Sequence, residues 1–380
     1  TIPISKVQRL HWIASVSKTG AHTYTGRIWY KDAAIASFPY TTVTIAVMAG
    51  PFGWLKIAKA TFSATGLPPR VMVYHYKSAY FHKVEFEFDA ETQITPGLSI
   101  QTHAHPNRPA TLPSETLSIQ TVFQRSGFKV STSPNPSSIA SPLGTTWSDM
   151  EMHDAMVAFW SRFQATAQWA MWVLFARQHE MGSGLGGIMF VDIGPNHRQG
   201  TALFYDSFIS TPPVGDPDPA AWVGRMEFWT AIHEMGHAFN LAHSWQKALG
   251  TPWIPLANEP EARSFMNYPY SVAGGQTAFF ADFAFRFSNT ELLFMRHAPA
   301  RFVRMGDANW FDNHAFEQAA LHPTPPLSLD VRFNRSRPAY EFLEPVVAEL
   351  KLKNISSTPQ VVDENILKTL DGITIALKRD

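Results

Sequence analysis

Apolar and polar residues alternate with a period of two in the first part of the chain. Val84, Phe86 and Phe88 are separated by charged residues, which is the pattern of a half-buried strand. Similar short runs precede them, and three prolines within residues 106–113 then mark a boundary. We therefore predict an N-terminal β-sandwich-like domain over residues 1–112.

Helical and extended patterns follow each other over residues 113–315. Asp218 before Pro219 is a helix start signal, and the helix should run to about Leu241. A glycine inside a helix costs about 1 kcal/mol, so Gly236 predicts that another group approaches the backbone there. Capping boxes open two further helices, at Ser148 with Glu151 and at Ser288 with Glu291. Strands are predicted at residues 168–177, 187–193 and 201–207, so the domain is α+β.

A second group of prolines, within residues 323–326, separates a C-terminal segment, residues 316–380. Its apolar residues alternate as in strands, which predicts a small β-sandwich-like domain. An immunoglobulin-like sandwich needs about 100 residues. The segment is therefore either an incomplete module or packs on the middle domain. The alternating residues are Ala348, Leu350 and Leu352, then Ile373, Ile375 and Leu377.

The composition limits which classes of partner this 380-residue chain is expected to bind. Lys+Arg and Asp+Glu are each 31, so the net charge is zero and offers no attraction for nucleic acid or an anionic membrane. No apolar run approaches the 18 residues that a membrane helix needs. Without cysteine there is no disulfide. We expect neither a nucleic-acid partner nor a membrane span, and the sequence indicates no oligomeric state.

The long predicted helix carries a group of residues suited to binding a metal ion. His233 and His237 lie four residues apart, on one face of the helix, and Glu234 projects near the open coordination position. His243 lies six residues beyond His237, so the chain must turn before it can join them. Asn240 is the predicted turn residue, because asparagine tolerates the left-handed conformation that ends many helices.

These residues resemble the zinc signature of the metzincin clan of peptidases, in which two helical histidines and a third after a turn bind zinc. The clan usually has glycine where this chain has Asn240. Residues 264–269 resemble the clan's methionine-containing turn, which implies that Met266 forms a floor under the metal. Tyr268 would reach the zinc or the oxyanion of the transition state. The resemblance implies a twisted sheet backed by helices.

The implied function is zinc-dependent endopeptidase activity on a protein or peptide substrate. Zinc with three neutral nitrogen ligands lowers the pKa of its bound water from 15.7 to about 7. Glu234 is the expected general base. The resemblance also implies that residues 200–207 form the edge strand that pairs with substrate, and that residues after Met266 shape a specificity pocket. The expected substrate-binding residues are Gly200, Thr201, Ala202, Leu203, Pro269 and Tyr270.

The compartment stays open, because the chain begins at Thr1 with neither an initiator methionine nor a signal sequence. An extracellular location is favoured only because an uncontrolled peptidase is more easily tolerated there.

Three other interpretations are also open. The chain could be a non-catalytic binding or adhesion protein in which zinc only stabilises the fold, although a structural zinc site normally has a fourth protein ligand. His103 and His105 could hold the metal of an amidohydrolase-type enzyme, although the chain lacks eight strand–helix repeats. Asp216 and Asp218 could bind calcium or serve as turn and cap residues.

Overall fold

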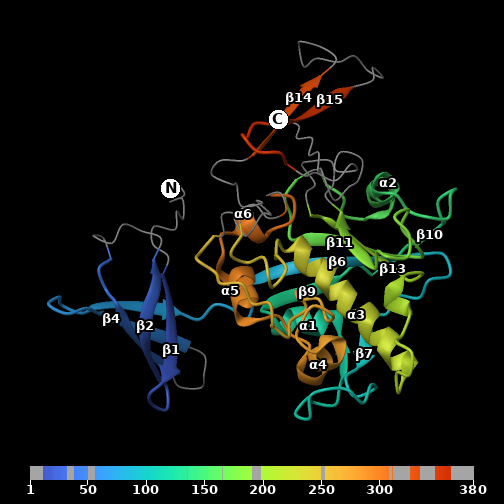
Figure 1. The fold of residues 1–380 in the computed structure, drawn as a ribbon. Coiled ribbons are helices and arrows are strands. Elements are labelled where there is room, and N and C mark those ends of the chain that lie inside the picture. The colour runs from blue at the N-terminus through green and yellow to red at the C-terminus, as the bar shows by residue number, and fades with distance from the viewer. Residues whose placement is uncertain are drawn as a thin grey trace.

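Figure 1 shows the fold of the computed structural model. The structure describes residues 12–31, 38–49, 56–134, 136–164, 166–190, 198–249, 253–307, 310, 326–333 and 347–360. Two larger sheets and several helices make up a mixed fold, so the predicted α+β class is confirmed. In these ranges, no helix combines the length and the apolar character that crossing a membrane requires.

The N-terminal region forms one antiparallel sheet of five strands in sequential order. Phe38, Val43, Ala60 and Phe62 form its small buried core. The alternating pattern gives each strand one apolar side, and in the described residues that side is not covered by a second sheet. The predicted sandwich is thus a single sheet over this part of the chain. Its strands are β1 (Trp12–Lys18), β2 (Thr23–Lys31), β3 (Thr42–Ala49), β4 (Lys56–Ser63) and β5 (Arg70–His75).

The second sheet has six strands in the order β10-β6-β11-β13-β12, with β9 also paired to β6. Neighbouring strands are parallel except β12, which runs antiparallel to β13 at one edge. Every residue of β11 is buried, as expected for a parallel strand covered on both faces. The strands are β6 (His82–Glu91), β9 (Phe128–Thr132), β10 (Ser138–Ile139), β11 (Ala170–Ala176), β12 (Gly187–Phe190) and β13 (Gly200–Phe204).

Strand β6 lies inside this second sheet, between β11 and the β9–β10 side. Its residues were assigned to an N-terminal domain over residues 1–112, but their partners come from residues 128–176. The division between the two sheets therefore falls before residue 82 and not at residue 112. The alternating pattern identified the strand correctly, whereas its position in the chain gave no information about its partners.

Helices cover both faces of the second sheet (Figure 1). One face packs on α1 (Ile119–Arg125) and α3 (Pro219–Ala238), and the other on α2 (Asp149–Phe159). Successive residues of β11 alternate between these two cores. Met171, Val173 and Phe175 join the α1–α3 side, and Trp172 and Leu174 join the α2 side.

Shorter elements complete the described fold. Both predicted capping boxes are present, at α2 and at α5. In the C-terminal segment β14 and β15 form a two-stranded antiparallel ladder, whereas the strand predicted at residues 373–377 lies outside the described residues. The remaining elements are β7 (Ser99–Gln101), β8 (Thr116–Ser118), η3 (Phe208–Ser210), α4 (Gly275–Asp282), α5 (Asn289–His297), α6 (Ala300–Val303), β14 (Leu327–Phe333) and β15 (Ala348–Asn354).

Candidate metal centre

Helix α3 ends in a turn built around Asn240. Asp218 caps the helix start by accepting a hydrogen bond from the Ala221 N–H at 3.1 Å, as predicted. At the other end Asn240 adopts the left-handed conformation, with φ of 65°. Its N–H donates to His237 O and the Leu241 N–H donates to Gly236 O, the two hydrogen bonds of a Schellman motif. The predicted turn residue is confirmed, and the Asn240 side chain also donates to Phe302 O at 2.9 Å.

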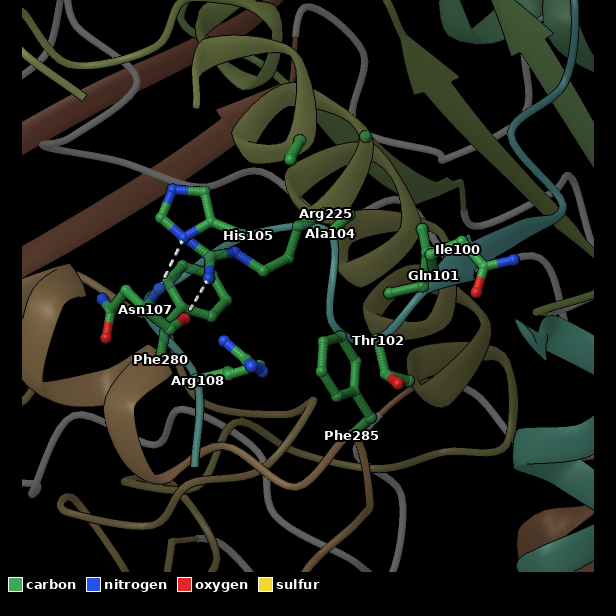
Figure 2. A pocket seen from close by; sticks show the side chains of 12 residues that line it. Ile100, Gln101, Thr102, Ala104, His105, Asn107, Arg108, Arg225, Phe280 and Phe285 are labelled. Atoms are coloured by element: carbon green, nitrogen blue, oxygen red, sulfur yellow. Dashed lines mark hydrogen bonds between the residues drawn. The ribbon is translucent and has the colours of Figure 1, made fainter. Parts of the chain in front are cut away.

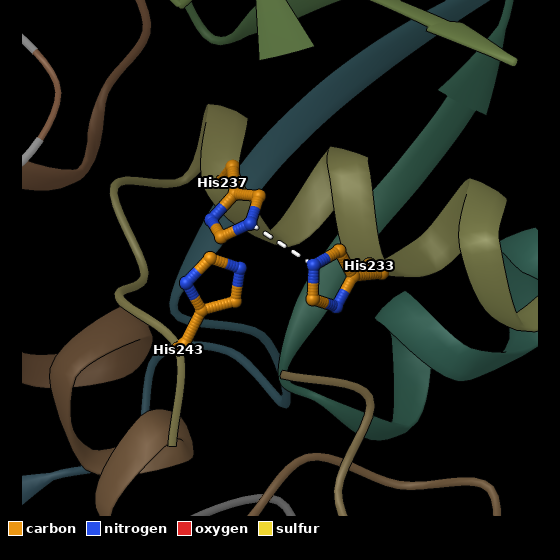
Figure 3. Close-up of side chains that lie close together, drawn as sticks. All are labelled: His233, His237 and His243. Carbon is orange, nitrogen blue, oxygen red and sulfur yellow. Dashed lines mark hydrogen bonds between the residues drawn. The ribbon is translucent and has the colours of Figure 1, made fainter. Parts of the chain in front are cut away.

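This turn brings His243 back to the two histidines of the helix, as Figure 3 shows. The Nε2 atoms of His233 and His237 lie 3.1 Å apart, and one ligand atom from each of the three rings lies within 4.8 Å of the others. A tetrahedral zinc ion with bonds of about 2.0 Å spaces its nitrogen ligands by about 3.3 Å. The three rings are therefore close enough to bind one metal ion.

Each ring nitrogen that faces away from this centre lies next to an oxygen. Nδ1 of His233 is 2.7 Å from Phe265 O, and Nδ1 of His237 is 2.8 Å from Leu241 O. Nδ1 of His243 is 2.6 Å from Oε1 of Gln246. These oxygens only accept, so each Nδ1 carries the proton and donates, which leaves Nε2 of the neutral ring with a bare lone pair.

The donor set fits a cation. Two Nε2 lone pairs at 3.1 Å repel each other unless a positive charge lies between them. Nε2 of His243 is buried and makes no hydrogen bond within the described part of the chain, although buried polar atoms normally have a partner. A metal ion shared by the three rings accounts for both features.

Burial sets the protonation states at this centre. It lowers the pKa of His233 to about 3 and that of His243 to about 4, so both rings are neutral ligands at neutral pH. Burial also raises the pKa of Glu234 to about 8, partly offset by a hydrogen bond from the Met189 backbone. A divalent cation nearby favours the ionised carboxylate, so metal binding and the charge of Glu234 are coupled.

Met266 lies directly against helix α3 between the two helical ligands. A Cβ atom at Gly236 would lie 2.3 Å from Sδ of Met266, a distance that no real contact allows. The predicted close approach at Gly236 is confirmed, and Met266 is the approaching group. The Met266 side chain is fully buried, and its place under the metal stays a prediction.

Tyr268 stands beside the triad, with its ring centroid 4.8 Å from His243 and 5.4 Å from His233. It lines the cavity that contains the three rings. Pro269 is buried and Tyr270 is 52% exposed. Neither is among the residues that line this cavity, although the Tyr270 ring packs on Tyr268.

The cavity beside the triad has a volume of about 350 Å³. Strand β12 forms one wall, and Glu234 packs so closely on it that a Cβ at Gly187 would lie 2.8 Å from Cγ of Glu234. The remaining lining residues are Asp149, Ile188, Met189, Phe190, His233, His237, His243, Tyr268 and Trp310.

Among the described strands, the edge strand beside the metal centre is β12 and not the predicted residues 200–207. Residues 200–204 form β13, which is hydrogen-bonded on both sides, to β11 and to β12. An interior strand has no free backbone groups to offer a substrate. The prediction was wrong for all four of its strand residues, which are buried: Gly200, Thr201, Ala202 and Leu203.

A buried polar network fixes the loop that carries His243. Glu291 accepts hydrogen bonds from Ser244 at 3.1 Å and from Ser264. Lys247 lies 2.8 Å from Glu291, and both side chains are completely buried. The network therefore joins the third ligand and the methionine turn to helix α5. The sequence indicated Glu291 only as a helix cap, and no sequence signal marked Gln246.

Figure 2 shows a cavity lined by His105, one residue of the alternative histidine pair. Nε2 of His103 is 2.6 Å from Leu112 O, and His105 lies 3.1 Å from Asp216. Asp216 also accepts from the Asp218 backbone, and Asp218 caps α3. Within the described residues, the only group of three metal-ligand side chains is the histidine triad. These contacts give His103, His105, Asp216 and Asp218 roles in loops and caps.

Comparisons of the chain with protein-family models, with curated proteins and with solved structures find no match.

Proposed function

We propose that this protein is a zinc-dependent endopeptidase of the metzincin type. The observation that carries the proposal is the convergence of three Nε2 lone pairs beside Glu234, in a cavity walled by β12, an edge strand among the described residues. The left-handed Asn240 turn and the contact of Met266 with Gly236, between the two helical ligands, support the same assignment. The open side of the triad favours catalysis over a structural zinc site, because no fourth ligand completes it in the described residues.

A zinc ion bound by the three rings would supply Lewis-acid chemistry, by lowering the pKa of water and polarising a carbonyl. Glu234 accepts a proton from the attacking water and delivers it to the amine nitrogen as the C–N bond breaks. The Tyr268 ring packs against His243, and we assign its hydroxyl to stabilising the carbonyl oxygen as it becomes negative. The Met189 N–H of β12 donates to Glu234, so an extended peptide would pair with the other backbone groups along the outer edge of this strand.

Replacing Glu234 tests this proposal. Glu234→Gln should keep one zinc per chain and reduce the cleavage of casein by roughly 10²- to 10⁴-fold, the usual contribution of a general base. Zinc content is measured by atomic absorption and cleavage by release of peptides. A chelator should abolish the wild-type activity, and added zinc should restore it.

The exposed Glu180→Gln is the control and should behave like the wild type. Full activity of Glu234→Gln would remove the residue from the mechanism. Zinc-loaded wild type that cleaves nothing in a broad peptide library would instead favour the non-catalytic binding protein.

A further inference from the structure

The cavity at the triad extends around the outer edge of β12 to the other face of the sheet. Met189 belongs to the core on the α3 side, whereas Ile188 packs with the core on the α2 side. Both residues line the cavity, together with Glu234 from α3 and Asp149 from α2. A ligand along this edge would therefore meet groups from both faces.

Asp149 is the first residue of α2, and its side chain is 69% exposed. Its Oδ1 lies 3.3 Å from Nε2 of the buried His179. Nδ1 of His179 accepts a hydrogen bond from the Met181 N–H at 3.2 Å, so the ring proton is on Nε2 and the ring is neutral. His179 thus positions the carboxylate without neutralising it. The second oxygen of Asp149 has no partner among the described residues.

The charged side chains that line the cavity are all acidic. Its lining residues include two carboxylates, Asp149 and Glu234, and no lysine or arginine. Glu234 lies beside the three rings and is used by the proposed reaction. Asp149 is on the opposite face of β12 and has no cationic partner in the described structure. It can therefore attract a positive charge on a ligand.

We propose that Asp149 is a specificity-determining residue that selects substrates with a lysine or arginine side chain at one subsite. This inference rests on the proposed peptidase function. Side chains of an extended peptide alternate between two directions, so a peptide paired with β12 presents every second side chain to the α2 face. The preference should therefore apply to one position and be absent at its immediate neighbours.

The test uses zinc-loaded protein and peptides acetylated at the N-terminus, so that the only cation is a side chain. At each position lysine is compared with norleucine, which has a similar length and no charge. We expect kcat/KM to be about two- to fivefold higher for lysine at one position, the effect of a favourable exposed ion pair. The difference should shrink in 0.5 M salt, because exposed charges are screened.

Variants of Asp149 test whether the lysine preference depends on this residue. Asp149→Asn keeps the oxygen that accepts from His179, and it should remove the lysine preference while leaving the norleucine peptide unaffected. Asp149→Lys should favour glutamate at the same position. Asp154→Asn, at an exposed position on the same helix, is the control and should retain the lysine preference. An Asp149→Asn enzyme that still prefers lysine, or a wild type without preference, would overturn the inference.

A binding arm separates this inference from the proposed function. Fluorescence anisotropy measures the affinity of the same labelled peptides for zinc-loaded Glu234→Gln, with and without Asp149→Asn. Absent cleavage with lysine-dependent binding would reject the peptidase and keep the role of Asp149. Cleavage without a preference for lysine would keep the peptidase and reject the role of Asp149. The absence of both cleavage and lysine-dependent binding would reject both.

Discussion

At the residue scale, the metal centre depends on which nitrogen of each histidine carries the proton. Two of the three Nδ1 atoms donate to backbone carbonyls, of Phe265 and Leu241. The third donates to a side chain, that of Gln246. A backbone carbonyl cannot be removed by substitution, but a side-chain amide can. Gln246 is therefore the position where the orientation of a ligand can be tested without changing a ligand.

We predict that Gln246→Leu will lower zinc affinity by about 10- to 100-fold, the usual cost of losing a hydrogen-bond partner of a ligand. The reason is that His243 loses the acceptor that holds its proton on Nδ1. Gln246→Glu keeps an oxygen at this position and should bind zinc at least as tightly as the wild type. Competition against a chromophoric chelator measures both affinities, and circular dichroism checks the fold. Equal affinity of Gln246→Leu and wild type would contradict this role.

At the element scale, helix α3 is buried along most of its length because it lies between the sheet and the segments that follow it. An ionisable side chain on such a helix either has a charged or hydrogen-bonding partner, or its pKa shifts so that the group is neutral. Glu227 lies two turns before Glu234 on the same face. Ser210 donates to it at 3.3 Å, and the partly buried Tyr205 lies nearby. Burial raises the pKa of Glu227 to about 7.

This shift predicts a pH-dependent stability. The pKa of Glu227 is higher in the folded state than its ordinary value of 4.5, so below pH 4.5 the residue is protonated in both states and costs nothing. As the pH rises to 7 the unfolded state releases its proton first, and folding becomes less favourable. Glu227→Gln should therefore gain stability relative to wild type across this range, by about 1 kcal/mol for a partly exposed group.

Urea unfolding at pH 4.5, 6 and 8 measures the effect, with the protein kept free of metal at every pH. The exposed Glu180→Gln should give a constant difference from the wild type. If the difference between Glu227→Gln and wild type is also constant with pH, the carboxyl of Glu227 is not perturbed by burial.

At the scale of the whole molecule, the features that the sequence predicted correctly are those set by residues close together in the chain. The triad, the Asn240 turn and the contact at Gly236 follow from spacing within one helix and its end. The edge strand could not be predicted, because β12 and β13 differ only in which strands they pair with. For the same reason β6 was assigned to the wrong side of a domain boundary. Gln246 and Glu291 act through contacts that no local pattern marks.

The position of β6 leads to a prediction about truncated chains. Val84, Phe86 and Phe88 belong to the same core as helix α3, and the strand pairs with both β9 and β11. A chain that begins at Lys77 keeps all of this, whereas one that begins at Pro113 loses the strand. By contrast, β1–β5 form a sheet of their own, and one contact to the rest is a 3.5 Å hydrogen bond from Tyr30 to Trp253 O.

Residues 77–380 should therefore unfold cooperatively and bind one zinc per chain, with a modest loss of stability. Residues 113–380 should lack both properties, because removing an interior strand exposes the apolar faces of its neighbours and leaves their backbone groups unpaired. Thermal unfolding and zinc content per chain distinguish the two. A folded, zinc-binding protein that starts at residue 113 would show that β6 is dispensable and that the boundary at residue 112 is the functional one. The metal centre depends on the second sheet as a unit, so we expect zinc binding to be retained when β1–β5 are removed and lost with β6.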